Sequence, residues 1–297
     1  LYMFGSTPTI LPYAKEYFLY ILIGTPFISG VFVMNNQMRL QGNAAISMIG
    51  VMIGAILNIA IDPLFIFNLD LGVAGAGMAT AISQMISFII MVLMIGMRGG
   101  ISIRIANFRP ARWIYVEILY GGLPSLARQS LLSIAAICLN NYASRYGDSA
   151  VAAFSVVNRV MMLATAILLG FGQGFQPVCG FNYGAMLYKR VRSAFRFSVV
   201  MATVYCLLIS LMGFAFAPAI VHLFRADDTE VLEIGAKVLR FNCYTFTLNG
   251  FIVLTNMFLQ NIRATKSAVA VAVSRQGLFF IPLLIIGANL FGLTGII

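Results

Sequence analysis

The stretch GAILNIAIDPLFIFNLDLGVAGAGMAT, from Gly54 to Thr80, places one carboxylate, Asp62, inside an apolar run that extends from Ile46 to Phe67. An ionisable side chain at the centre of a membrane span costs at least about 2.5 kcal/mol, so such residues commonly mark functional sites. Asn58 lies one helical turn before Asp62 and on the same helix face. Pro63 follows directly and interrupts the backbone hydrogen bonding of the helix.

The composition predicts an all-α polytopic membrane protein. Apolar residues make up 61% of the chain and charged residues only 9%, and apolar runs long enough to cross about 30 Å of hydrocarbon recur from end to end. Regular alternation typical of a membrane β-barrel is absent. We predict eight transmembrane helices, at residues 13–36, 45–67, 72–96, 118–142, 149–178, 195–217, 232–259 and 267–290.

The segments between these spans alternate in charge, which predicts the orientation of the chain. Every second segment is basic, and the intervening ones are acidic or balanced. The basic segments contain Arg39; Arg98, Arg104, Arg109 and Arg112; Lys189, Arg190, Arg192 and Arg196; and Arg263 with Lys266. Since basic loops stay on the cytoplasmic side, we expect residue 1 on the outer side of a multi-pass protein in the cell membrane. The net charge of +10 therefore indicates topology and no nucleic-acid partner.

An internal repeat with an offset of about 220 residues predicts two related halves. Asn35 recurs as Asn256, Pro63 as Pro282, and Gly72 as Gly292. The matching spans have the same orientation, which indicates two pseudo-symmetric six-helix lobes in a twelve-helix protein. On this interpretation the chain is a fragment that lacks the first three helices and the last. Its parts are the end of the amino lobe (1–96), a cytoplasmic linker (97–117) and the carboxy lobe (118–297).

The residues around Asp62 are candidates for binding a coupling ion. Thr80 follows on the next span, at a depth close to that of Asp62 at a rise of about 1.5 Å per residue. A carboxylate, an amide and a hydroxyl at one level provide suitable oxygen atoms for a proton or Na⁺. The alternative is that Asp62 caps the helical segment that restarts at Pro63, with Asn58 packing beside it. The equivalent position before Pro282 is Ile281, which favours the functional interpretation.

Other polar residues within spans are candidates for a substrate cavity. Arg128 and Gln129 lie about ten residues into the fourth span, and Arg275 and Gln276 occupy a similar position in the last. Each arginine could instead reach the membrane surface with its head group. The glycine-rich segment GFGQGFQPVCGFNYGA, at 170–185, is interpreted as closely packed, bendable helix.

Enzymatic, metal and cofactor functions find no support in the sequence. It contains no H-E-x-x-H, G-x-S-x-G or Walker motif. The four cysteines are far apart, and the single histidine, His222, has no thiol or carboxylate partner nearby, so we expect no metal or cofactor. Transport without a nucleotide site would have to use an ion gradient.

Several segments in order resemble the MATE family of multidrug and toxic compound extrusion transporters, in particular its prokaryotic DinF-like branch. They include NNQMRLQGN (35–43), GAILNIAIDPLFIF (54–67), YGDSAVAAFSVVNRV (146–160) and GFGQGFQPVCGFNYGA (170–185). The resemblance implies two lobes, alternating access, and export of cationic small molecules in exchange for H⁺ or Na⁺. It also implies that Asn58, Asp62 and Thr80 belong to an amino-lobe ion site.

The sequence departs from the sodium-coupled branch of this family. The position of that branch's carboxy-lobe glutamate falls near Leu132, and span 232–259 has a carboxylate only at its edge, Glu233. This difference argues against ion coupling in the carboxy lobe. We therefore predict a monomeric, ion-coupled antiporter. The alternatives are a flippase for lipid-linked precursors, which should use several cations to hold phosphate, and a non-transporting membrane scaffold, which would leave Asp62 without a role.

Overall fold

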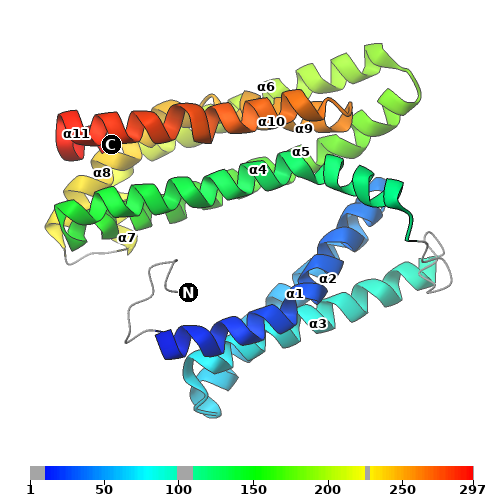
Figure 1. The fold of residues 1–297 in the computed structure, drawn as a ribbon, viewed down its shortest axis with the longest axis horizontal. Helices are drawn as coiled ribbons and strands as arrows, with labels where there is room; N and C mark the ends of the chain where they lie inside the picture. The colour runs from blue at the N-terminus through cyan, green and yellow to red at the C-terminus, as the bar shows by residue number, and fades with distance from the viewer. Residues whose placement is uncertain (1–10, 99–109, 225–227, 297) are drawn as a thin grey trace. The chain divides into compact units, whose positions relative to one another are not determined.

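The described residues of the chain form helices joined by short turns (Figure 1). The structure is a computed structural model that describes residues 11–98, 110–224 and 228–296. No strand occurs within these ranges, which confirms the predicted all-α class. The chain divides into two compact units, Leu1–Arg109 (unit 1) and Pro110–Ile297 (unit 2).

Unit 1 is a bundle of three long helices, α1 (Leu11–Leu40), α2 (Ala44–Pro63) and α3 (Gly72–Arg98). A short π-helix, η2 (Leu64–Asn68), continues α2. Glycines allow α3 to pack closely against both neighbours: a Cβ at Gly24 would lie 3.2 Å from the Cα of Ala81 on α3, and one at Gly54 would lie 2.8 Å from the Cβ of Ser87. Small residues have this role in membrane bundles because packing, rather than the hydrophobic effect, holds the helices together.

Unit 2 contains the remaining helices, arranged around two apolar cores. Buried residues of α5, α6, α8 and α9 meet in one of these cores, around Leu168, Cys206, Phe246 and Leu254. In chain order the elements are α4 (Arg112–Ala143), η4 (Ser144–Tyr146), α5 (Asp148–Gly184), α6 (Tyr188–Ala215), α7 (Ala217–Phe224), α8 (Thr229–Phe246), α9 (Asn249–Asn261), α10 (Thr265–Val273), η5 (Ser274–Phe280) and α11 (Ile281–Ile296).

Seven helical segments of the described residues are long and apolar enough to cross a membrane. They correspond to seven of the eight predicted spans. The other predicted span, 232–259, falls on α8 and α9, which are separate helices joined at Thr247 and Leu248. Four charged residues, Glu230, Glu233, Lys237 and Arg240, lie on α8, so hydropathy alone does not define a single span there. The total of eight spans stays a prediction.

Helix ends differ from the predicted boundaries. α4 begins at Arg112 and α6 at Tyr188, several residues before the predicted spans. Residues 112–117 of the predicted linker are therefore helical, whereas its residues 99–109 lie outside the described ranges. Hydropathy marks only the apolar part of a helix, but backbone hydrogen bonding continues past it into the polar interface, where long basic side chains reach water.

One hydrogen bond occurs in the same form in both units, at positions that the predicted repeat pairs. The side-chain amide of Asn35 donates to the carbonyl oxygen of Ser47 at 3.0 Å, joining α1 to α2. The amide of Asn256 donates to the carbonyl oxygen of Ala268 at 2.9 Å, joining α9 to α10. Each bond crosses the same number of residues, so the sequence match of Asn35 with Asn256 corresponds to the same local hydrogen bond in both units.

The turns enclosed by these two bonds also match. Gly42 and Arg263 both have positive φ, at 81° and 59°, in the position that commonly ends a helix. The next N–H in each turn reaches back to a carbonyl of the preceding helix, from Asn43 to Met38 and from Ala264 to Leu259, at 2.9 Å in both cases. This 6→1 bond is the Schellman arrangement. Arg263 adopts the conformation at a steric cost that Gly42 avoids.

Candidate functional site

The helix that contains Asp62 changes its hydrogen-bonding pattern directly after that residue. Pro63 has no N–H, so the carbonyl of Ile59 cannot receive the usual helical bond from it. The chain then forms the π-helix η2, in which the N–H of Leu69 bonds to the carbonyl oxygen of Leu64 at 3.0 Å. π-Helical segments are rare and occur frequently at functional sites. The acidic residue thus lies at a discontinuity of its helix.

Asn58 connects the other two predicted site residues. Its side-chain amide lies 3.2 Å from Oδ1 of Asp62 and 3.4 Å from Oγ1 of Thr80. The Thr80 hydroxyl donates in turn to the carbonyl oxygen of Ala76 at 3.0 Å, so its lone pairs are available to accept. All three side chains are half-buried. The three residues predicted from the sequence therefore lie together in the structure, Asn58 and Asp62 on α2 and Thr80 on α3.

The arrangement leaves oxygen atoms with spare acceptor capacity. Both hydrogens of the Asn58 amide are used by Asp62 and Thr80, so its carbonyl oxygen and the second carboxylate oxygen of Asp62 can accept a proton or a cation. Within the described residues no backbone N–H donates to Asp62. A helix cap requires such a bond, and the capping interpretation of Asp62 is therefore not supported.

Gly75 allows the backbones of η2 and α3 to come into contact. A Cβ at Gly75 would lie 2.7 Å from the carbonyl oxygen of Phe65, closer than such atoms come in proteins. Since Phe65 follows Asp62 and Gly75 precedes Thr80, this contact fixes the distance between the two halves of the site.

Replacing Gly75 with alanine should therefore force η2 away from α3. We expect the variant to lose roughly 1–3 kcal/mol of stability, the usual cost of overpacking, measured as a lower unfolding temperature of the purified protein. Gly96→Ala is the matched control, because it lies on the same helix and a Cβ there meets nothing within 4 Å. Equal unfolding temperatures for the two variants would contradict this account of the contact.

The predicted cavity residues lie in unit 2. Arg128 is half-buried and Gln129 exposed on α4, and neither side chain bonds to another described residue. Arg275 and Gln276 belong to η5, but their side chains lie outside the described set. α4 and η5 do pack together, since a Cβ at Gly277 would lie 3.2 Å from Cδ2 of Leu131. The structure thus brings the two helical segments together without defining a shared site for the side chains.

The two π-helices of the described residues were not predicted from the sequence, although the prolines beside them were an available signal. η2 directly follows Pro63, and η5 ends shortly before Pro282. The repeat paired these two prolines but did not reveal the wider helical turns beside them. The described residues contain no group of three His, Cys, Asp or Glu side chains that could bind a metal ion.

The long apolar helices of the described residues define a polytopic helical membrane protein. Its α2 helix, long and apolar enough to cross a membrane, carries a carboxylate that accepts a hydrogen bond from Asn58. The family model MatE matches residues 1–64 and 124–286. This chain belongs to the MatE family, so the family resemblance of its sequence motifs is confirmed.

Curated relatives with similar sequences are multidrug export proteins. The chain is 26% identical over 299 residues to the multidrug export protein MepA of Staphylococcus saprophyticus, covering 100% of this chain and 65% of that protein. It is 28% identical over 296 residues to MepA of Staphylococcus aureus strain MSSA476, covering 99% and 64% respectively. The chain thus spans slightly less than two thirds of the length of these relatives.

Solved structures of MATE proteins have a similar fold. A crystal structure of MATE in the bent conformation matches with a TM-score of 0.87 and 27% identity, over 98% of this chain and 65% of the other. The outward-facing conformation of a multidrug resistance MATE family transporter of the MOP superfamily also matches with a TM-score of 0.87 and 27% identity, over 95% and 64%. Family and fold thus agree: this chain belongs to the MatE family and has the helical fold of these solved MATE structures.

Proposed function

We propose that this protein is an ion-coupled antiporter that exports organic cations by alternating access, with Asp62, Asn58 and Thr80 binding the coupling ion. The observation that carries the proposal is the Asn58 amide, which bonds both to the Asp62 carboxylate and to the Thr80 hydroxyl. These contacts hold a carboxylate from α2 and a hydroxyl from α3 around one point.

The chemistry of the three residues fits either H⁺ or Na⁺. A carboxylate can take up a proton directly, and carboxylate, amide and hydroxyl oxygens together can bind Na⁺ as hard oxygen ligands. In both cases the bound ion neutralises Asp62, which lowers the cost of the charge within the membrane. Release of the ion restores the negative charge of Asp62 and changes the interactions between α2 and α3. The change would stabilise a different conformation of the transporter.

The names of the relatives support export of drugs, because the curated proteins that match are described as multidrug export proteins.

We further propose that Arg128, Gln129, Arg275 and Gln276 contribute to the substrate cavity, that the protein acts as a monomer in the cell membrane, and that residue 1 faces the outside. A flippase for lipid-linked precursors has less support, since it would need several cations to hold phosphate and the proposed cavity contains only two arginines, Arg128 and Arg275.

The hydroxyl of Thr80 provides a direct test of this geometry. Thr80→Val keeps the shape of the side chain and removes the acceptor of the Asn58 bond, so ion-driven export should fall by roughly threefold, in line with the small energies of hydrogen bonds between membrane helices. Thr80→Ser restores the hydroxyl and should restore export. The measurement is efflux of a fluorescent organic cation from proteoliposomes under an imposed pH or Na⁺ gradient. Equal export by the valine and serine variants would show that Thr80 takes no part.

A further inference from the structure

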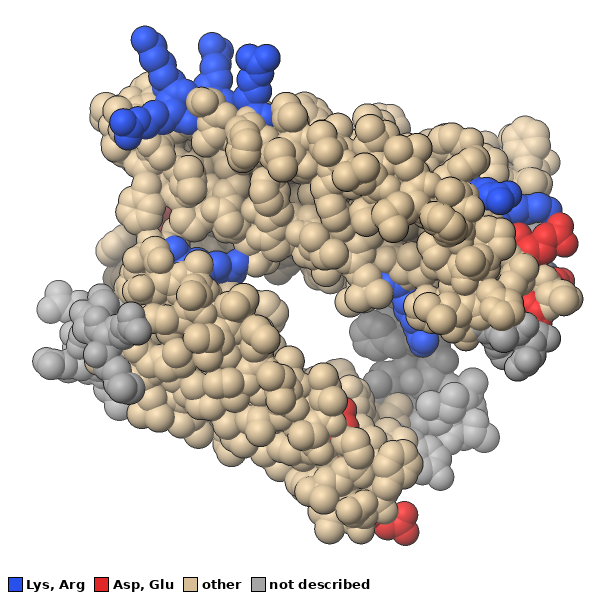
Figure 2. Space-filling view, turned by 180° about the vertical axis from the view of Figure 1, so that it is seen from behind, with Lys and Arg blue, Asp and Glu red and all other residues tan. Residues whose placement is uncertain are grey.

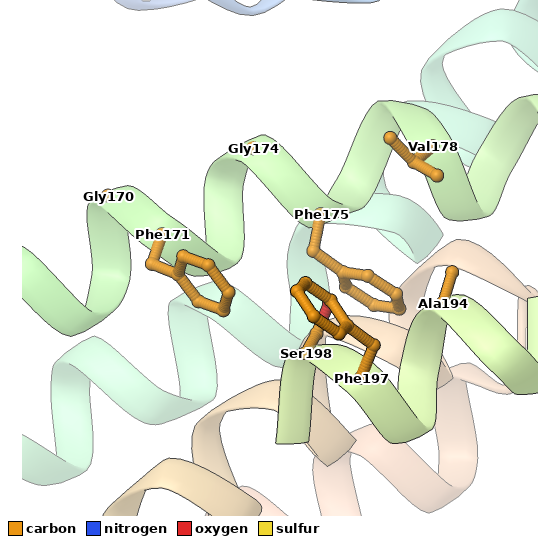
Figure 3. A pocket seen from close by; sticks show the side chains of 8 residues that line it. All are labelled: Gly170, Phe171, Gly174, Phe175, Val178, Ala194, Phe197 and Ser198. Atoms are coloured by element: carbon orange, nitrogen blue, oxygen red, sulfur yellow. The ribbon is translucent and has the colours of Figure 1, made fainter. Parts of the chain in front are cut away.

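A groove runs between α5 and α6 on the surface of unit 2 (Figure 3). Its volume is about 340 Å³, within the size range of small-molecule sites. It is lined by Gly170, Phe171, Gly174, Phe175, Val178, Ala194, Phe197 and Ser198. Ser198 is the sole lining residue with a polar side chain, so this α5–α6 groove is suited to a hydrocarbon chain.

The groove exists because two glycines on α5 leave space instead of packing against another helix. A Cβ at Gly170 or Gly174 would meet nothing within 4 Å. Gly172, on a different face of α5, does pack closely, against Met257. Among the described residues, Gly172 is therefore closely packed, as interpreted from the sequence, whereas Gly170 and Gly174 are not.

One end of the groove is strongly basic. Lys189, Arg190, Arg192 and Arg196 lie in the first turns of α6, and no carboxylate of the described residues forms an ion pair with any of them. Figure 2 shows Lys and Arg side chains projecting from this end of the molecule without Asp or Glu among them. Solvent-exposed cations at the end of an apolar groove complement an anion that carries an apolar tail.

Arg190 is the basic residue that shares a helix face with the groove. Arg190, Ala194 and Ser198 are spaced by four residues, so they form one stripe along α6. Arg196 lies between Ala194 and Ser198 in sequence, two residues from each, and therefore points to another side of the helix. The groove is thus apolar along its length, with one guanidinium on the same stripe at the end beside the α5–α6 turn.

We propose that the α5–α6 groove binds an anionic phospholipid of the surrounding bilayer. One acyl chain lies along Gly170, Gly174 and Val178, between the rings of Phe171 and Phe197, and the phosphate lies at Arg190. Basic sites between membrane helices bind anionic head groups in this way, and guanidinium matches phosphate geometry through paired hydrogen bonds. This site is separate from Asp62, and the proposal does not depend on the proposed transport function.

Lipid titration of the full purified chain in detergent, followed by native mass spectrometry, tests the charge requirement. We expect phosphatidylglycerol to be retained more tightly than phosphatidylcholine of the same chain length. Arg190→Gln should weaken phosphatidylglycerol binding by about fivefold. Arg196→Gln removes the same charge from another side of α6 and should weaken it by less than about twofold. Equal losses for the two variants, or equal retention of both lipids by the wild type, would overturn the proposal.

A second pair of variants tests the groove itself. Gly174→Leu places a side chain in the space of the acyl chain and should reduce phosphatidylglycerol retention by roughly as much as Arg190→Gln. Gly184→Leu is the control, because Gly184 also lies on α5, has nothing within 4 Å of a Cβ and does not line the groove. Unfolding temperatures measured without lipid establish that each variant is folded. Unchanged lipid retention by folded Gly174→Leu would show that the groove is not the site.

Discussion

Replacing Asp62 with asparagine should reduce ion-driven export by on the order of a hundredfold, the upper range of typical coupling energies between binding sites. The substitution keeps the size of the side chain and its ability to accept from the Asn58 amide, which lies 3.2 Å from Oδ1. It removes the negative charge and the site of protonation. The variant should therefore fold normally and still fail to exchange H⁺ or Na⁺ for substrate.

Asp70→Asn is the matched control for this experiment. Asp70 is the other carboxylate in the Gly54–Thr80 stretch, and it is exposed between η2 and α3. Its φ is 53°, a conformation that asparagine also tolerates well. We expect the Asp70→Asn variant to export substrate at the wild-type rate. A comparable loss in both variants would mean that negative charge near the end of α2, and not the site at Asp62, is what transport requires.

Replacing Asn58 with leucine should have the second largest effect, a loss of export on the order of tenfold. The substitution preserves approximate volume and removes the donor of both bonds that hold the site together. A hydrogen bond to a charged group is worth about 1.5–3 kcal/mol. Asp62 would remain but would lose its fixed orientation, so ion coupling should weaken rather than disappear.

The measurement is the initial rate of export at a series of imposed pH and Na⁺ gradients. The wild type and Asn58→Leu should both respond to the gradient, with a lower rate in the variant. Asn68→Leu makes the same change at an exposed position of η2 and should leave the rate unchanged. Wild-type rates in Asn58→Leu would show that Asp62 needs no orienting donor.

The central polar site could be predicted because it depends on short-range spacing. Asn58 and Asp62 are one helical turn apart in any helix, and Thr80 occurs at a similar depth on the next one. The sequence could not show that a single amide donates to both partners, since that depends on how closely α2 and α3 approach. The approach is set by Gly54 and Gly75, which are two of many glycines in the chain.

The helical class could be predicted from hydropathy, but some helix ends and interruptions could not. α8 carries four charged residues and is separate from α9, because contacts with α5 and α6, rather than hydropathy, determine where these helices lie. The π-helices η2 and η5 leave no periodic signal of their own. Proline marks a disturbed helix, but it does not specify whether the chain bends, ends or widens into a π-turn.

The repeat was predicted from a few matching residues, and the structure gives it a physical basis. Asn35 and Asn256 match because each joins two helices through the same side-chain bond. Gly72 and Gly292 match because both have positive φ, at 52° and 60°. Asp62 has no acidic counterpart before Pro282, where Ile281 stands. The proposed coupling site therefore has no acidic counterpart in unit 2 at the position that the predicted repeat pairs with it.

The coupling role of Asp62 is tested most directly by measuring whether the coupling ion is released when substrate binds. The natural polypeptide carrying this sequence is purified in weakly buffered detergent solution, an organic cation is added, and released protons are measured with a pH-sensitive dye and released Na⁺ with a radioactive tracer. We expect the wild type and Asp70→Asn to release one of these ions and Asp62→Asn to release neither. Release of the same amount of ion by Asp62→Asn would contradict the coupling role of Asp62.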